Sequence, residues 1–209
     1  MTWLILGLIL FLGAHSVRVV ADNWRAEKIQ AWGDKAFKGV HALVSLLGFY
    51  LLVVGYGEAR LLTVALWNPP IFTKHISMLL MLFSSILLMA AYIPRNHFKT
   101  RLGHPMVLSV KVWALSHLLA NGNLADLVLF GSFLIWAVLN FRSARARDRA
   151  LLLHLNVTED AAGEPLAESE STNQPKLLST IITLVSGIAT WALITFVLHA
   201  KVVGVSPMG

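Results

Sequence analysis

Apolar stretches long enough to cross a lipid bilayer recur along almost the whole chain, and this recurrence limits the possible folds more than any other feature. Of the 209 residues, 56% are hydrophobic and 13% are charged, whereas about a quarter of a soluble domain is charged. Inside a bilayer every backbone N–H and C=O group must be hydrogen-bonded within the protein, which favours α-helices. The sequence therefore predicts an all-α integral membrane protein that has the lipid bilayer as its surroundings.

The apolar stretches predict six transmembrane helices. Their expected ranges are 2–21, 39–57, 73–93, about 105–120, 124–142 and 177–200. The fourth of these is short, because its sixteen residues at ~1.5 Å per residue reach about 24 Å. That length is less than the ~30 Å of a hydrocarbon core.

A tight hairpin is expected between the fourth and fifth helices, at Asn121-Gly122-Asn123. Gly122 can adopt a left-handed conformation just past a helix end, and Asn123 can cap the next helix, with Asp126 in its first turn. Because the fourth helix is short, we expect this bend to lie within the outer half of the membrane, sheltered by protein.

Basic residues are concentrated in three of the segments between the predicted helices. Residues 22–38, 94–104 and 142–176 contain 12 of the 17 Lys and Arg residues. Because cytoplasmic loops carry an excess of Lys and Arg, these loops are predicted to be cytoplasmic and both termini periplasmic. The same distribution accounts for the net charge of +6 without a nucleic-acid partner.

We expect a single domain over residues 1–209, with a flexible cytoplasmic loop at about 143–176. The part of this segment from Glu159 to Glu170 contains five of the eleven acidic residues. Low hydrophobicity combined with a high density of one charge is typical of disordered segments.

Ionisable side chains within the predicted helices are the candidates for function, because such groups are costly at membrane depth. The chain has eight histidines and no cysteine, which excludes disulfides and thiolate metal ligands. It has no His-Glu-x-x-His motif, so a zinc hydrolase is unsupported. Among the histidines in or at the edge of predicted helices, we single out His15, His41, His104 and His117. They are candidate metal or haem ligands; the alternative is that they form hydrogen bonds between helices.

Two basic residues also lie within predicted helices. Lys111 is about seven residues inside its helix, where an ammonium group requires an anionic partner such as Asp126 or the carboxylates of a ligand. Arg18 is three residues from the cytoplasmic end of its helix, and its side chain can reach the headgroups. Trp113 lies four residues before His117 and shares its helix face, either in the core or in a pocket wall.

Three segments resemble one known family, the NnrU family. They are LGLILFLGAHSVR, HALVSLLGFYLLVVGYG and HPMVLSVKVWALSHLLANGNLADLVLFGSFLIWAV, and the resemblance covers nearly the whole chain. Its members are bacterial inner-membrane proteins linked to expression of nitrite and nitric-oxide reductases. The resemblance therefore implies a multi-pass protein of the bacterial inner membrane, with a nitrogen-oxide reductase as a possible partner.

The same family includes the 15-cis-zeta-carotene isomerase, which is similar to a haem b enzyme with two axial histidines. His15-Ser16 matches the first ligand motif, and Trp113, His117, Gly122 and Asn123 match the second. Ala114 stands where the isomerase has a cysteine, which puts the isomerase activity in doubt. The resemblance implies haem b held by His15 and His117. With haem in place, we expect Lys111 and Arg18 to lie near its propionates, because basic groups at membrane depth require anionic partners. Trp113, Asn121 and Asn123 are the remaining expected cofactor-binding residues, and His41 with His104 is the alternative ligand pair.

Three functions remain open from the sequence. The first is a haem-dependent isomerase-like enzyme that acts on a lipophilic polyene. The second is a non-enzymatic haem protein or nitric-oxide-responsive membrane protein that supports denitrification. The third is a cofactor-free assembly or regulatory factor for nitrogen-oxide reductases.

Overall fold

The computed structural model of the chain is helical, as predicted. It describes residues 1–61, 64–162 and 174–207, and the side chains of 155–162 are not described. The helices are α1 (Thr2–Val20), α2 (Asp22–Trp32), α3 (Asp34–Leu61), α4 (Ile71–Tyr92), α5 (His97–Leu102), α6 (Pro105–Ala120), α7 (Leu124–Ala162), α8 (Leu177–Leu193), the π-helical turn η1 (Ile194–Leu198) and α9 (His199–Val203).

Five helical segments of the described chain are long and apolar enough to cross a membrane. They are Thr2–Val20, Asp34–Leu61, Ile71–Tyr92, Leu124–His154 and Leu177–Val203. The expected fourth span is α6, an apolar helix of 16 residues that is shorter than a bilayer-spanning segment. The membrane character of the chain is thus confirmed, whereas the number of six spans stays a prediction.

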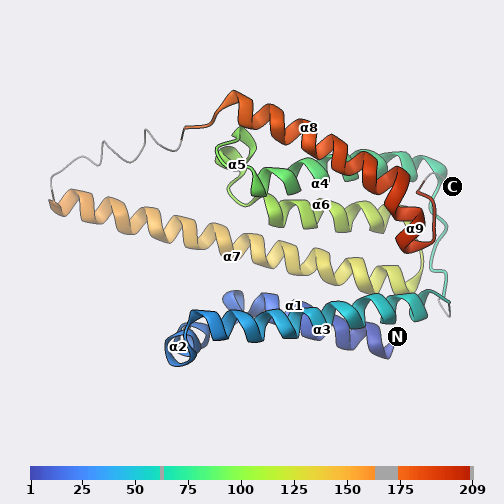
Figure 1. Cartoon of the computed structure of the whole chain (residues 1–209), viewed down its shortest axis with the longest axis horizontal. Helices are drawn as coiled ribbons and strands as arrows, with labels where there is room; N and C mark the ends of the chain where they lie inside the picture. Colours follow the sequence, from blue (N-terminus) through green and yellow to red (C-terminus); the bar gives the residue numbers. More distant parts are fainter. Residues whose placement is uncertain (62–63, 163–173, 208–209) are drawn as a thin grey trace.

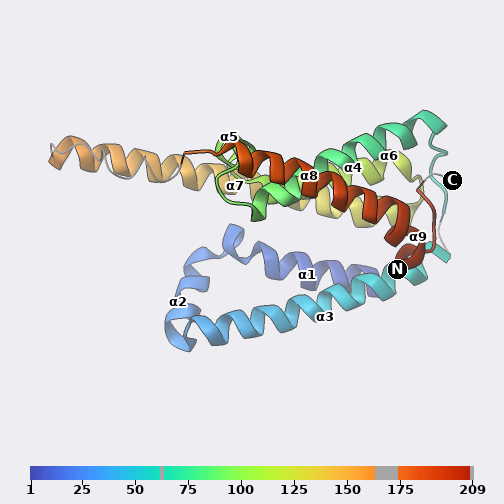
Figure 2. The ribbon, with the colours of Figure 1, turned by 45° about the horizontal axis from the view of Figure 1, so that its top comes forward.

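The long helices form two groups with α7 between them (Figure 1), and Figure 2 shows α1 and α3 set apart from the other long helices. On one side α1 packs against α3, and on the other α4 packs against both α6 and α8. α7 contacts α1, α3 and α6. The two chain ends marked in Figure 1 lie at the same end of the bundle, opposite α2 and α5. We refer to the end with α2 and α5 as the basic end, because the basic segments expected in the cytoplasm converge there.

Glycines bring α1 and α3 together. A Cβ atom added to Gly48 would lie 2.7 Å from the backbone nitrogen of Phe11, and one added to Gly7 would lie 2.6 Å from that of Leu52. At Gly55 an added Cβ would overlap the backbone of Leu4. The glycines of α1 and α3 therefore form a close-packing face, as small residues do between membrane helices.

Two serine pairs connect α4 to α6. The Ser77 hydroxyl donates to the carbonyl of Ser116 at 2.6 Å, and the Ser116 hydroxyl donates to the carbonyl of Ser77 at 2.9 Å. Ser84 and Ser109 exchange the same two bonds at 3.0 and 2.8 Å. All four side chains are buried. The polar groups are thus satisfied between the helices, as an apolar interior requires.

The bend between α6 and α7 is covered by the segment that follows α3. Leu66 donates its backbone N–H to the carbonyl of Gly122 at 2.8 Å, and Leu124 donates to the carbonyl of Val64 at 3.0 Å. These bonds confirm that protein shelters the bend, with Asp126 in the first turn of α7 as expected. The left-handed conformation predicted for Gly122 is wrong, since its φ is not positive. Glycine is required there because any Cβ atom would overlap the carbonyl of Trp67.

Two segments expected as loops are helical. Most of the predicted polar loop at 22–38 forms α2 and the first turn of α3. In the expected flexible loop at about 143–176, residues up to Ala162 continue α7, and residues 163–173 lie outside the described part of the chain. The physical reason is that 143–153 is rich in Ala, Arg and Leu, which have high helix propensity. The acidic composition from Glu159 to Glu170 therefore did not predict the structure of the residues that precede it.

Candidate functional site

His15 lies on the last turns of α1 at the basic end of the bundle. Its Nδ1 atom lies 2.7 Å from the carbonyl oxygen of Phe11. Because a carbonyl oxygen only accepts, Nδ1 must carry the hydrogen, and Nε2 of the neutral ring keeps its lone pair. The ring lies beside those of His41 and Trp136, with centroids 5.3 and 6.3 Å away. Such an anchored Nδ1 is the usual arrangement of a metal-ligating histidine.

A cavity of about 390 Å³ opens beside His15. Its polar lining comes from α1, α7 and the residue before α6, and comprises His15, Arg18, His104, Asn140, Arg147 and Asp148. We call this the His15 cavity. Its volume falls within the ~300–1,000 Å³ that is typical of small-molecule sites.

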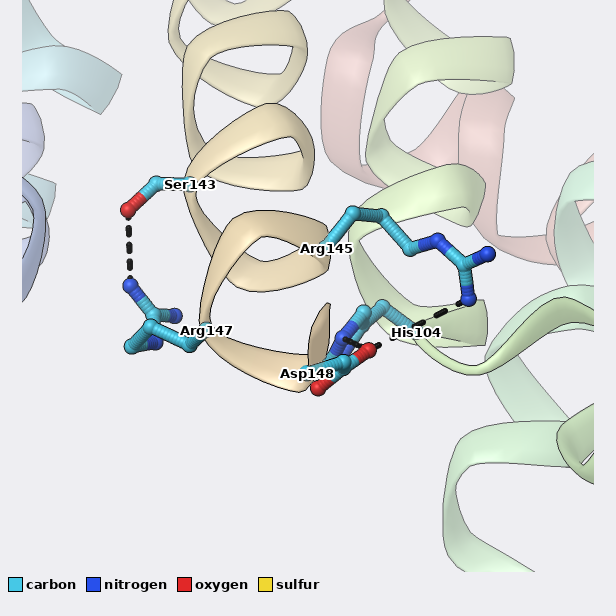
Figure 3. Close-up of polar contacts among 5 residues, drawn as sticks. All are labelled: His104, Ser143, Arg145, Arg147 and Asp148. Carbon is cyan, nitrogen blue, oxygen red and sulfur yellow. Dashed lines mark hydrogen bonds and ion pairs between the residues drawn. The ribbon is translucent and has the colours of Figure 1, made fainter. Parts of the chain in front are cut away.

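His104 reaches the His15 cavity as the N-cap residue of α6. Its Nε2 lies 2.8 Å from a carboxylate oxygen of Asp148 on α7, and Arg145 approaches the same oxygen at 4.0 Å (Figure 3). Arg147 points the other way, toward the hydroxyl of Ser143 at 2.7 Å (Figure 3). With Nε2 held by a carboxylate, the Nδ1 atom of His104 is the ring nitrogen left for another partner.

The His15 cavity carries more positive than negative charge. Arg18 and Arg147 line it, and Asp148 is its one carboxylate among the described lining residues. Asp148 already contacts His104 and Arg145. Arg18 has no ion pair among the residues that the structure describes. The cavity can therefore accept an anionic group without losing an existing ion pair.

A smaller cavity of about 200 Å³ lies on the other side of His15. Its lining includes Arg18, Arg25 and His41. The Nε2 atom of His41 lies 3.2 Å from the carbonyl oxygen of Ala14. The alternative pair of the sequence analysis, His41 and His104, is therefore divided between the two cavities that adjoin His15.

His117 occupies the last turn of α6 and is anchored in the same way as His15. Its Nδ1 donates to the carbonyl of Trp113 at 2.9 Å, and its ring stacks on Phe130 with centroids 4.5 Å apart. It lines a different cavity, which also includes Asn121 and has a volume of about 300 Å³. Asn121 caps α6 by donating to the carbonyl of His117 at 2.9 Å.

The structure does not bring His15 and His117 together around one cavity. A chain of ring contacts runs between them through Phe11, Phe133 and Trp113, with successive centroids 4.4, 5.9, 5.3 and 5.3 Å apart. A single iron between the two histidines would require these rings to move apart. Ligation of one iron by His15 and His117 stays a prediction, and it requires that these rings separate.

The remaining predicted residues have other surroundings. The ammonium group of Lys111 lies 4.6 Å from the ring centroid of Phe141, a cation–π contact that replaces the expected anionic partner. Trp113 packs its ring against Phe130 and Phe133 in the core. Asn123 pairs with Ala65 in an isolated β-bridge. None of these three residues lines the His15 cavity.

Sequence reasoning missed the contribution of α7 to the His15 cavity. Asn140, Ala144, Arg147, Asp148 and Leu151 line it from one helix face, at the spacing i, i+4, i+7, i+8 and i+11. That periodicity is an amphipathic helix signal, and it was overlooked because the segment after Arg142 was interpreted as a loop.

The comparison with protein families agrees with the resemblance found in the sequence. The family model described as NnrU protein matches residues 3–207. The comparisons with curated proteins and with solved structures gave no significant match. Since the match extends over nearly the whole length, this helical membrane protein belongs to the NnrU family.

Proposed function

We propose that the protein binds haem b at the His15 cavity, where His15 would ligate the iron. The observation that carries the proposal is the joint lining of one cavity by two histidines and two arginines: His15, His104, Arg18 and Arg147. Haem needs few protein ligands, because the porphyrin supplies the equatorial donors. Consistent with this, no group of three or more His, Cys, Asp or Glu residues that could hold a bare metal ion occurs in the described chain.

The donor chemistry of the cavity fits this cofactor. His15 has its Nδ1 anchored on a backbone carbonyl, so its Nε2 lone pair is free for iron. Arg18 and Arg147 can pair with the two propionates, since guanidinium groups bind carboxylates in a bidentate manner.

Two histidines are candidates for a second ligand that would hold the iron. His104 shares the cavity with His15, and the family resemblance implies His117. We favour His104, because the cavity needs no rearrangement of the Phe11, Phe133 and Trp113 rings. The bond between His104 and Asp148 would orient the imidazole, as carboxylates do for many metal-ligating histidines.

The visible absorption spectrum of the detergent-purified protein tests this proposal. We expect a Soret band and stoichiometric haem. His15→Ala should lose the haem, and His104→Ala should lose it or change its spin state. His117→Ala should retain the haem, and His75→Ala is the matched control because this exposed histidine lines none of the three cavities.

Each outcome has a distinct meaning. Haem loss in His15→Ala and His117→Ala, with retention in His104→Ala, would still support haem as the cofactor. It would identify His15 and His117, the pair implied by the family, as the ligands. Full haem content in His15→Ala would overturn the site. If the purified protein cannot bind added haem at all, the proposal of a haem cofactor is wrong. The function as a cofactor-free assembly factor would then remain.

The cellular role that we propose is support of nitrite and nitric-oxide reduction in a denitrifying bacterium. When bound, the haem would supply a redox-active iron whose open or displaceable position can take nitric oxide. Isomerisation of a lipophilic polyene is the alternative. Turnover of a cis-polyene by the haem-loaded protein would favour isomerisation. A nitric-oxide-dependent shift of the Soret band without such turnover would favour the proposed role.

We further propose that the chain crosses the bacterial inner membrane six times, with α6 as the fourth crossing and both termini in the periplasm. The support is the position of the basic segments: α2 and α5 lie at the end of the bundle opposite the two termini (Figure 1). Positively charged loops remain on the cytoplasmic side of the inner membrane. The cytoplasmic part would then include the second half of α7.

A further inference from the structure

A second amphipathic cavity lies at the end of the bundle where the chain terminates, away from the His15 cavity. It has a volume of about 300 Å³ and is bounded by α4, α6, η1, the start of α9 and residues 205–207. We call it the His117 cavity. α6 and α8 both pack on α4 but not on each other within the described chain, so α4 forms the floor of this space.

One end of the His117 cavity is polar and basic. Lys74 lies in the first turn of α4, His199 begins α9, and Asn121 follows the end of α6. No Asp or Glu is found among the lining residues that the structure describes. Lys74 is partly buried and has no ion pair in the described part of the chain. An unpaired ammonium group in a half-buried position favours an anionic ligand.

Two histidines add directed hydrogen-bonding groups to this end. Nδ1 of His117 donates to the carbonyl of Trp113, and Nδ1 of His199 donates to the carbonyl of Val205 at 2.7 Å. Each ring thus keeps its Nε2 for a ligand. An Nε2 atom whose ring donates through Nδ1 can accept a hydrogen bond from the acidic head group of a ligand.

The other end of the His117 cavity is apolar. Met78 and Met81 line it one and two turns along α4 from Lys74, and seven residues of helix cover about 10 Å. Ile194 faces them from η1. Methionine side chains are flexible and adapt to irregular apolar ligands, and π-helical turns such as η1 are frequent at functional sites.

We propose that the His117 cavity binds a single-chain amphiphile, with its acidic head at Lys74, His117 and His199 and its apolar chain along Met78, Met81 and Ile194. The volume of about 300 Å³ favours an amphiphile with one chain over a bilayer lipid with two. The head could be the carboxylate of a fatty acid or the phosphate of a lysophospholipid. This inference goes beyond the proposed function, because it uses a cavity that the haem proposal does not require.

Native mass spectrometry of the detergent-solubilised full-length protein with added oleate tests the inference. We expect one oleate per chain. Lys74→Gln should weaken its binding roughly tenfold, as expected for the loss of one charge-assisted contact, and Lys74→Arg should restore most of it. Lys201→Gln is the matched control, because this exposed lysine on α9 does not line the cavity.

Two further probes identify the head group. Oleoyl lysophosphatidate carries the same chain on a phosphate, and oleyl alcohol carries it on a neutral head. Tighter binding of oleate would indicate a carboxylate head group, and tighter binding of lysophosphatidate would indicate a phosphate head group. Both results support an acidic head. Equal binding of oleyl alcohol and oleate, or unchanged oleate binding in Lys74→Gln, would overturn the proposal.

A space-filling variant locates the ligand. Ala120 lines the His117 cavity, and Ala120→Leu should abolish oleate binding while the haem spectrum stays unchanged. Oleate binding that persists at wild-type strength in a folded Ala120→Leu protein would show that the amphiphile binds elsewhere. Unfolding temperatures of all variants verify that they remain folded.

Discussion

Single glycines control how closely α1 and α3 approach. Gly55 and Gly57 lie two residues apart on α3, yet a Cβ atom at Gly55 would overlap the backbone of Leu4, and one at Gly57 would meet nothing within 4 Å. We expect Gly55→Ala to reduce the free energy of unfolding by about 1–3 kcal/mol, the usual cost of overpacking. Gly57→Ala should be neutral or stabilise by up to about 1 kcal/mol through helix propensity.

Reversible unfolding in detergent, followed by tryptophan fluorescence, measures both glycine variants. The two substitutions are chemically identical and lie on the same helix, so their difference isolates the contact with α1. Equal stability of the two variants would contradict the close packing of α1 on α3.

A polar pair, the partly buried Tyr56 and the buried Asp126, connects α3 to α7. The Tyr56 hydroxyl donates to a carboxylate oxygen of Asp126 at 2.5 Å, and Asp126 is 4% exposed. Tyr56→Phe leaves the buried carboxylate without this donor, which we expect to cost about 1–3 kcal/mol of unfolding free energy. In Tyr56→Phe/Asp126→Leu both polar groups are absent, so part of the stability should return. A double variant less stable than Tyr56→Phe would refute this account.

At the scale of residues, the sequence predicted the functional side chains more reliably than it predicted the residues that they contact. His15 and Arg18 were found because ionisable groups are rare in membrane helices, and they do line one cavity. Their neighbour Asp148 was missed, because it lies 44 residues from its partner His104 and such long-range contacts have no local signal. Lys111 was expected to need a carboxylate, whereas an aromatic face satisfies it.

At the scale of elements, the serine pairs fix the register of α4 against α6. Ser84→Ala/Ser109→Ala removes two reciprocal bonds between the helices. Since hydrogen bonds between membrane helices contribute about 0.6 kcal/mol each, we expect the double substitution to lower the unfolding free energy by roughly 1 kcal/mol. Ser186→Ala is the control, because the Ser186 hydroxyl bonds to carbonyls of its own helix α8. A control that costs as much as the double substitution would speak against the inter-helix bonds.

Hydrophobicity predicted the elements well where it was the dominant signal. The expected helix at about 105–120 coincides with α6, and that at 73–93 differs from α4 by two residues at one end and one at the other. The predictions failed where polar sequence is helical. α2 places Trp24 and Trp32 on either side of Lys28, whose ammonium group lies 5.9 and 5.7 Å from their rings. Helix propensity and such local contacts are invisible to an analysis based on apolar runs.

At the scale of the whole molecule, two kinds of site occupy opposite ends of the bundle. The His15 cavity is cationic and lies at the basic end, where Arg18 and Arg147 face it. The His117 cavity lies at the end with the chain termini and has an apolar floor on α4. The aromatic rings of Phe11, Phe133 and Trp113 fill the core between the two histidines. A substitution in one cavity can therefore remove the ligand of that cavity without changing the other cavity. The two proposals can be tested separately for this reason.

The proposed topology rests on the length of α7 and on the charge at its far end. Its 39 residues cover about 58 Å at ~1.5 Å per residue, nearly twice the ~30 Å of a hydrocarbon core. In Figure 1 its second half extends past the other helices, and that half carries Arg145, Arg147 and Arg149. We therefore expect Leu153, which is 67% exposed, to lie in the cytoplasm, and we expect Lys201 on α9 to lie in the periplasm.

The natural chain has no cysteine, so a single introduced thiol reports its own side of the membrane. In cells with a permeabilised outer membrane, a membrane-impermeant maleimide should label Lys201→Cys and spare Leu153→Cys. Disruption of the inner membrane should then allow labelling of Leu153→Cys. Ala137→Cys, at a fully buried position on α7, should remain unlabelled throughout, as should the parent protein. Labelling of Leu153→Cys in cells with an intact inner membrane would reverse the orientation, because the basic end of the bundle would then face the periplasm.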